Sequence, residues 1–553
     1  MRHSNTVIQE NPVRSNADLR AHRRSRMRFL KCFSLSALLL TAILLPSACK
    51  RSQSNVFVIA LSDNIKTIDP IGSPSVDAAS ERVRTLMFNS LVKKDDKFDY
   101  VPELASNIQR SDDGLSFTFT LRDGVTFHDG RPFTSADAKY TLDTVLASTF
   151  AKATSFFQGS GASKIALVKS VEAPDPRTLI IRLNKQWTGL LPNLVPIAMI
   201  PKDSYESQKA HPLGTGPFKF KSYDQVQQVL DLEANQNYWD GPSKLPALRV
   251  RAISESNTMQ AELQSGRVDI APLATSLSPD AIQGLSKNPN LSVQQFGGSN
   301  LNLLTFNTTE APLDNIKVRQ ALAYAIDRES MIRDLVLNQG EIAHSILPEA
   351  SWAYQRPQTY QFDPNKAKQL LDEAGFRDPD GDGPQMRWAT PLLFRISGSS
   401  AAARQYSGVV QNYLKNVGVP VAIETSEFNT MRQQVQNGQF QINYSQWVGG
   451  NQDPIFYHDL FATSEIATPT KGLNRSRYSN PELDKILDEA ANTYDHAKAA
   501  PLYAKAQEII ARDVPVFPLW YQANMVIAKK SVGNIKVNAS GDWGFIKDLT
   551  VTK

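Results

Sequence analysis

The sequence predicts a mixed α/β fold that is spread over more than one domain. Its 553 residues exceed what a single hydrophobic core usually organises. Residues 117–121 alternate apolar and polar side chains with the period of a strand. Residues 363–375 and 480–490 instead place apolar side chains at helical spacing behind a capping residue. Because both kinds of signal occur along the chain, we expect sheets that are covered by helices.

The first half of the chain carries the clearest strand signals. An apolar run at residues 56–60 marks a first strand. Asp123 and Gly124 are a two-residue hairpin signal. We therefore expect residues 119–122 to pair with residues 125–127.

Helices are indicated by caps that are followed by apolar positions. Thr134 with Asp137 three residues later resembles a capping pair. Residues 316–336 predict one amphipathic helix. An Asp-Pro pair at residues 363–364 and an Asn-Pro pair at residues 480–481 each supply a cap and a first-turn proline.

Residues 1–48 have the pattern of an export signal. A basic run over residues 20–31 precedes an apolar run over residues 35–45, and small residues follow it. The apolar run is too short for a membrane-spanning helix. Met27 lies inside the basic run, and a shorter signal of the same pattern could begin there. Translation is therefore expected to start either at Met1 or at Met27.

This leader accounts for the apparent basic character of the chain. It holds 8 of the 60 Lys and Arg residues and 2 of the 55 Asp and Glu residues. The rest of the chain has 52 Lys and Arg residues and 53 Asp and Glu residues, a net charge near −1. The formal charge of +5 therefore does not indicate nucleic-acid binding.

The chain has two cysteines, Cys32 inside the leader and Cys49 directly after it. Residues 45–49 (LPSAC) resemble a bacterial lipobox, although Pro46 stands where leucine is usual. A lipidated Cys49 would hold residues 49–55 as a short tether at a membrane face. An ordinary cleaved signal with an incidental cysteine is the alternative. In either case one mature cysteine excludes an internal disulfide.

A series of motifs in a fixed order resembles one known family. The most specific is FTLRDGVTFHDGRPFTSAD at residues 119–137. The others are TIDP at 67–70, GTGPF at 214–218, NYW at 237–239 with Gly241, VRQAL and AIDR within 318–328, residues 367–375, and Trp447 with Asp453-Pro454. Together they resemble the family 5 extracellular solute-binding proteins, the oligopeptide, dipeptide and nickel receptors of ATP-binding-cassette (ABC) importers. The resemblance covers roughly residues 55–530.

The resemblance implies an α/β fold of the periplasmic binding protein class II type, with two lobes, a hinge and three subdomains. The lobes would close around a bound solute. The expected divisions are residues 56–92, 205–305 and 520–553 for the core of lobe I, residues 93–204 for its accessory domain, and residues 306–519 for lobe II.

The resemblance also implies a receptor and not an enzyme. Its expected ligand is a peptide or another small molecule, and its expected partners are the permease and ATPase subunits of the importer. We expect a monomer on the periplasmic side of the cell envelope, anchored through Cys49, with no nucleic-acid partner.

One position departs from the pattern of the peptide-binding members. There, an aspartate three residues after the late tryptophan pairs with the α-ammonium group of the ligand. In this chain that position is Gly450. Three explanations stay open: another acid substitutes (Glu424, Glu427 or Asp453), a peptide is held differently or is blocked, or the solute is a sugar, a metal chelate or another non-peptide. A buried ammonium group without a partner would cost several kcal/mol.

The candidate ligand-binding residues come from the late tryptophan element, from the first loop, where relatives offer an edge to the ligand backbone, and from the expected crossing into the second lobe. They are Asn64, Lys66, Thr67, Asn300, Asn302, Tyr444, Trp447, Gly449, Gly450, Asn451 and Asp453. We expect no catalytic residue, no metal site and no cofactor. The chain has no HExxH and no GxxxxGK[ST] motif, and His128 in the main motif is interpreted as structural.

Overall fold

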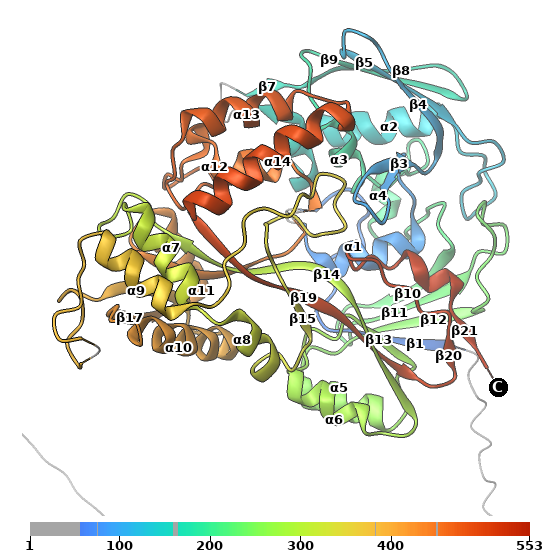
Figure 1. Ribbon diagram of the computed structural model, residues 1–553. Helices are drawn as coiled ribbons and strands as arrows, with labels where there is room; N and C mark the ends of the chain where they lie inside the picture. Colours follow the sequence, from blue (N-terminus) through green and yellow to red (C-terminus); the bar gives the residue numbers. More distant parts are fainter. Residues whose placement is uncertain (1–55, 74–75, 159–163, 382, 450–451, 553) are drawn as a thin grey trace, which may run out of the picture. The chain divides into compact units, whose positions relative to one another are not determined.

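The computed structural model describes residues 56–73, 76–158, 164–381, 383–449 and 452–552. The leader, the tether with Cys49, and the two candidate residues Gly450 and Asn451 lie outside the described residues. The expectation of a mixed α/β fold is confirmed, because helices and strands alternate along the whole described chain (Figure 1).

The largest sheet has eleven strands, in the order β10-β11-β12-β1-β13-β19-β14-β18-β16-β17, with β15 added against β19. Their bounds are β10 Phe218–Asp224, β11 Val229–Ala234, β12 Ala247–Ala252, β1 Val56–Leu61, β13 Ile270–Pro272, β19 Val516–Lys529, β14 Leu291–Phe306, β18 Ile442–Trp447, β16 Leu392–Ser397, β17 Val421–Ser426 and β15 Gly340–Ile342.

A second sheet of four strands has the order β4-β5-β9-β8. Its strands are β4 Ala105–Arg110, β5 Ser116–Leu121, β9 Thr178–Leu183 and β8 Val168–Asp175. Three two-stranded pairs complete the strands: β2 Val92–Lys94 with β3 Tyr100–Pro102, β6 Phe157–Gln158 with β7 Ile165–Ala166, and β20 Val532–Gly533 with β21 Thr550–Val551.

The helices cover these sheets. Their bounds are α1 Ala78–Met87, α2 Ser135–Leu146, α3 Leu190–Leu194, α4 Tyr205–Gln208, α5 Ser256–Gln264, α6 Pro279–Ser286, α7 Ile316–Ala325, α8 Arg328–Asp334, α9 Pro364–Glu373, α10 Ala401–Lys415, α11 Phe428–Gln436, α12 Phe456–Phe461, α13 Pro481–Ala491 and α14 His496–Asp513. Three short 3₁₀ turns span η1 Ala151–Phe156, η4 Thr463–Glu465 and η5 Gly544–Asp548.

The long strands β14 and β19 join the two ends of the large sheet. They pair antiparallel from Leu291 with Lys529 to Thr305 with Val516, and both run through the centre of Figure 1. The pairing is interrupted between Phe296 and Asn300, at Gly297, Gly298 and Ser299. A Cβ at Gly298 would lie 1.9 Å from the carbonyl oxygen of Gln522, so only glycine fits this close approach.

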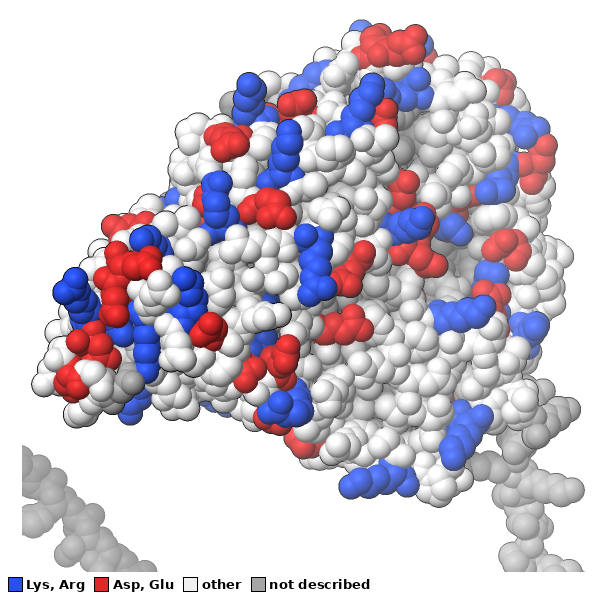
Figure 2. All heavy atoms as spheres, viewed as in Figure 1, with Lys and Arg blue, Asp and Glu red and all other residues white. Residues whose placement is uncertain are grey.

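Separate hydrophobic cores lie on either side of this interruption. One core joins β1, β11 and β12 to the four-stranded sheet. Two others pack α7, α9 and α10, and α12 to α14, on opposite faces of β14 and β18. On the face drawn in Figure 2, acidic and basic side chains are intermixed, with no broad patch of either sign.

The local expectations are mostly confirmed. Strand β5 buries Phe117, Phe119 and Leu121 on one face. Thr134 is the N-cap of helix α2 and forms a capping box with Asp137, in which the backbone N–H of Thr134 donates to the Asp137 carboxylate at 2.8 Å. Helices α9 and α13 begin with the expected cap and first-turn proline.

Two local predictions are wrong. Residues 119–122 do not pair with residues 125–127, because both edges of β5 are already occupied by β4 and β9. Residues 125–127 instead pair back on residues 131–133. The single helix expected over residues 316–336 is two helices, because the side chain of Asp327 accepts from the Ser330 N–H and starts α8.

The main motif and the GTGPF motif pack directly on each other through His128. Its Nε2–H donates to the Gly216 carbonyl at 3.1 Å, and its Nδ1 accepts from the Gly214 N–H at 3.3 Å. Gly216 has no room for a side chain, because a Cβ would lie 2.4 Å from the carbonyl carbon of Met87. A neutral imidazole satisfies both contacts, and burial lowers the pKa of His128 to about 4.

We expect His128 to make the stability of the fold depend on pH between 6.5 and about 4. The unfolded chain takes up a proton near pH 6.5 and the folded chain only near pH 4, so acidification through this window favours unfolding. The loss is roughly 3 kcal/mol. Chemical denaturation of the native chain and of His128→Gln across this range measures it, and the variant should have the shallower slope.

Replacement of the exposed His211 by Gln is the control and should keep the native slope. Equal slopes for the native chain and His128→Gln would show that His128 is not the group responsible.

Candidate functional site

Strand β18 places two candidate aromatic residues on opposite faces of the sheet. Side chains alternate along a strand, and β18 pairs with β14 in register, Tyr444 opposite Leu304 and Trp447 opposite Leu301. Tyr444 therefore faces the core of α7, α9 and α10, whereas Trp447 faces the core of α12 to α14. The structure does not bring these two candidates together.

Tyr444 and Asn302 form a buried polar pair. The Tyr444 hydroxyl donates to Asn302 Oδ1 at 2.7 Å, and Asn302 is 2 % exposed. Burial raises the pKa of Tyr444 well above its ordinary value, so the hydroxyl stays protonated and remains a donor. Among the described residues, nothing accepts from Asn302 Nδ2. Asn300 lies two residues earlier in β14, opposite Gln522, and is half-buried.

Trp447 ends β18 and opens the glycine loop. Its ring packs edge-on against Phe456 with the ring centroids 4.8 Å apart. The guanidinium carbon of Arg475 lies 5.2 Å from its ring centroid. Gly449 has a φ of +78°, and no described atom lies within 4 Å of the position that a Cβ would occupy. The space beside Gly449, next to Trp447, is therefore free of other described atoms.

Asp453 is already engaged by another part of the chain. The Tyr100 hydroxyl donates to Asp453 Oδ2, and the Ile455 N–H donates to Oδ1 at 2.9 Å. Burial, together with the charge of Asp453, raises the pKa of Tyr100 well above its ordinary value. Next to it, Gln452 accepts from Lys94 Nζ at 3.0 Å and donates to Ser299 Oγ at 2.9 Å.

The other two acids that could replace the missing aspartate also have partners. Glu424 accepts from Arg395 at 3.0 Å. Glu427 caps α11, where its carboxylate accepts from the N–H groups of Asn429 and Thr430. Each of the three carboxylates therefore already has a partner within the protein.

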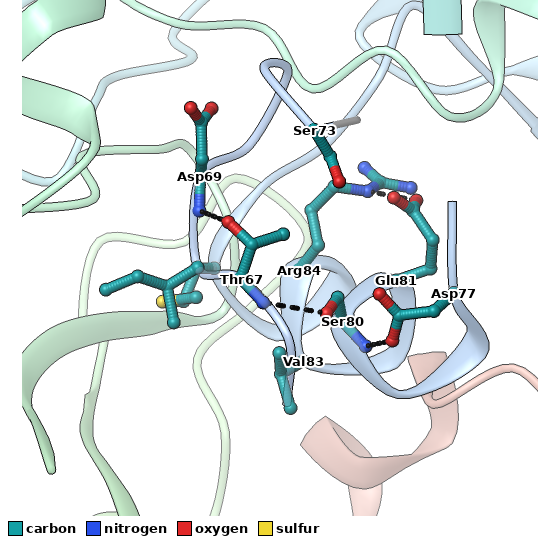
Figure 3. A pocket seen from close by; sticks show the side chains of 10 residues that line it. Thr67, Asp69, Ser73, Asp77, Ser80, Glu81, Val83 and Arg84 are labelled. Atoms are coloured by element: carbon teal, nitrogen blue, oxygen red, sulfur yellow. Dashed lines mark hydrogen bonds and ion pairs between the residues drawn. The ribbon is translucent and has the colours of Figure 1, made fainter. Parts of the chain in front are cut away.

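Of the candidates in the first loop, Thr67 lies in a small polar group with Asp69 and Ser80 (Figure 3). The Thr67 N–H donates to Ser80 Oγ at 3.2 Å, and Thr67 Oγ1 accepts from the Asp69 N–H at 3.0 Å. The Lys66 N–H also donates to Ser80 Oγ, at 3.2 Å. Asn64 and the Lys66 side chain are exposed. The pocket lined by Thr67, Asp69 and Ser80 has a volume of about 10 Å³, which is room for about one water molecule.

Residues within 99–192 and residues within 352–503 together line a larger cavity of about 110 Å³. Tyr100 and Asp453 line it, together with Trp352, whose ring stacks on His496 at 3.6 Å. Beside it, the Thr188 hydroxyl donates to the Ala491 carbonyl at 2.6 Å. These contacts could not be predicted from the sequence, because their partners are more than a hundred residues apart.

In the described part of the chain, no group of three His, Cys, Asp or Glu side chains is placed to hold a metal ion. None of the described helices is both long and apolar enough to cross a membrane.

Comparison with known proteins gives one consistent group. The family model for bacterial extracellular solute-binding proteins, family 5 Middle, matches residues 99–469. The heme-binding protein A of Haemophilus influenzae is 31 % identical over 85 % of this chain and 88 % of that protein. The oligopeptide-binding protein AppA of Bacillus subtilis is 28 % identical over 92 % of this chain and 96 % of its own length. The solved structure of HbpA2 from Haemophilus parasuis has a TM-score of 0.77 at 24 % identity, covering 90 % of this chain and 100 % of that one.

The Tyr100–Asp453 contact predicts energetic coupling across residues 353 apart in sequence. Tyr100→Phe and Asp453→Asn should each destabilise the fold, and the double variant should lose less than the sum of the two. We expect a coupling of about 1–3 kcal/mol, typical of a hydrogen bond to a charged group. Chemical denaturation of the four proteins measures it.

Tyr205→Phe provides a matched control, because the Tyr205 hydroxyl donates to Asp69 instead. Its effect should add to that of Asp453→Asn. Simple additivity of Tyr100→Phe with Asp453→Asn would contradict the contact.

Proposed function

Because the chain belongs to the bacterial extracellular solute-binding proteins of family 5, we propose that it captures peptides between its two lobes and delivers them to an ABC importer. It is a receptor and not an enzyme. The energy for uptake comes from the partner ATPase subunits, and the receptor acts as a monomer that presents its ligand to the permease subunits.

The observation that carries the proposal is the end of β18. Trp447 offers an aromatic wall, and the loop behind it opens at Gly449, where no described atom blocks the approach of another backbone. A peptide in such a site is held mainly by main-chain hydrogen bonds, which every peptide sequence can make. The similar AppA protein is named for oligopeptide binding.

We propose the same division of the chain that the motifs imply. The core of lobe I is formed by residues 56–92, 205–305 and 520–553, its accessory domain by residues 93–204, and lobe II by residues 306–519. The hydrophobic cores support the separation of lobe I from lobe II. One core contains residues of the lobe I core and of its accessory domain together, from Phe57 to Leu273 and from Val526 to Leu549, and two others lie between Leu301 and Tyr521.

A second candidate is a receptor of the same fold for a non-peptide solute. Gly450 stands where the peptide-binding pattern has its aspartate, and the three nearest substitutes are engaged elsewhere. The similar heme-binding protein A is named for a non-peptide ligand. Sugars and metal chelates belong to the same alternative.

The two candidates differ in what the native protein retains. The mature chain should be purified without denaturation and then unfolded, and the released solute should be identified by mass spectrometry. Titration with tri-alanine and penta-alanine follows.

We expect Trp447→Ala to lower the peptide affinity about 30-fold, the effect of removing a central aromatic contact.

Trp447→Phe keeps a ring against Phe456 and tests the same wall if the alanine variant does not fold. Trp388→Ala, which removes a tryptophan that packs on Phe376 instead, is the matched control and should bind as the native chain does. An unchanged affinity in both Trp447 variants would remove this residue from the ligand site.

We further propose that Cys49 is lipidated and holds the receptor at the periplasmic face of a membrane. The full chain expressed in a Gram-negative host should fractionate with membranes, and its mature N-terminus should carry the mass of acyl chains. Cys49→Ser should move the protein to the soluble fraction. A mature N-terminus at Cys49 without added mass would refute lipidation and leave the receptor function untouched.

A further inference from the structure

Arg475 is half-buried and lacks the close partners that the four buried arginines of the described chain have. Arg84 pairs with Glu81, and Arg387 pairs with Asp372. Arg319 and Arg328 donate to backbone carbonyls at 2.6–3.2 Å. Arg475 has no carboxylate within ion-pair distance among the described residues, and its one side-chain hydrogen bond is long, 3.4 Å from Nε to Gln436 Oε1.

The surroundings of Arg475 add positive charge instead of removing it. Burial lowers the pKa of its guanidinium group, and the nearby Arg432 lowers it further. Arg432 is exposed, so its own charge is solvated. Arg475 is half-buried, and a partly desolvated guanidinium group without a carboxylate partner is costly unless an anion arrives from outside.

The backbone that carries Arg475 is also held in one place. Asn474 is fully buried, and its side chain donates to the carbonyls of Ala462 and Tyr478. The Ser476 carbonyl accepts from the Thr308 N–H at 2.9 Å. The Arg475 guanidinium group lies over the Trp447 ring. The Nη1 and Nη2 groups of Arg475 donate to no described residue. A guanidinium group whose terminal N–H groups are unpaired can donate two parallel hydrogen bonds to the two oxygens of a carboxylate.

We propose that Arg475 anchors a carboxylate group of the bound solute, with Trp447 as the wall beside it. The inference rests on the proposed function, since it places the solute at Trp447. The solute would therefore carry a carboxylate group. The protein would hold the acidic end of its ligand, whereas the peptide-binding pattern holds the ammonium end. This agrees with a glycine at position 450.

The test pairs a change in the protein with a change in the ligand. Tri-alanine and its C-terminal amide are titrated by calorimetry into the mature native chain and into Arg475→Gln. We expect the native chain to prefer the free acid about 30-fold, as a charge-assisted contact does. Arg475→Gln should bind the acid about 30-fold more weakly and the amide within about twofold of native. Arg475→Lys should keep part of the preference.

Arg477→Gln is the matched control, because it removes one positive charge from the same loop while its guanidinium contacts only the Gln436 carbonyl. It should keep the native preference. The inference is overturned if Arg475→Gln weakens acid and amide equally, or if the native chain does not distinguish them.

A non-peptide pair, 3-phenylpropionate and its amide, separates this inference from peptide capture. If tri-alanine does not bind but 3-phenylpropionate binds with an Arg475-dependent preference, peptide capture fails and the carboxylate anchor stands. If neither acid binds the native chain, the anchor is overturned as well.

Discussion

The antiparallel pairing of β14 with β19 is the constraint on which the rest of the structure depends. These strands belong to both halves of the large sheet, so each half is completed by segments from distant parts of the sequence. Their register breaks at Gly297 to Ser299, between the separate hydrophobic cores. A strand pair that continues through a local break can bend there without losing its cores, as a hinge requires.

The same strands explain why the candidate residues divide into groups. Alternation along β14 and β18 sends Asn302 and Tyr444 to one face and Trp447 to the other. At the end of β18, no described atom lies within 4 Å of the position that a Cβ on Gly449 would occupy. Residues 93–204 contact the chain just after this loop, through Tyr100 to Asp453 and Lys94 to Gln452. We therefore propose that ligand contact at Trp447 and closure at Gln452 and Asp453 are linked.

Features that depend on neighbours in sequence could be predicted from the sequence. The capping box at Thr134 and the Asx-Pro starts of α9 and α13 need only three or four residues. The hairpin after Asp123 was predicted wrongly because the two edges of β5 pair with β4, which precedes it directly, and with β9, which lies about 60 residues further along the chain. The break before α8 was missed because apolar periodicity continues across Asp327 while its side chain caps a new helix. The contact between Tyr100 and Asp453 has no signal in the local sequence, because the two residues are 353 positions apart. The local sequence also does not show that Arg475 has no carboxylate partner among the described residues.

The central claim is that two lobes close on a solute at the end of β18. Pulsed electron paramagnetic resonance measures this directly on the mature chain, with Cys49→Ser and spin labels at Lys185→Cys and Lys485→Cys, one on each side of the contact between residues 187–188 and 491–494. The account predicts one short distance at saturating solute and an added longer distance without it. An identical distance distribution in both conditions would contradict it.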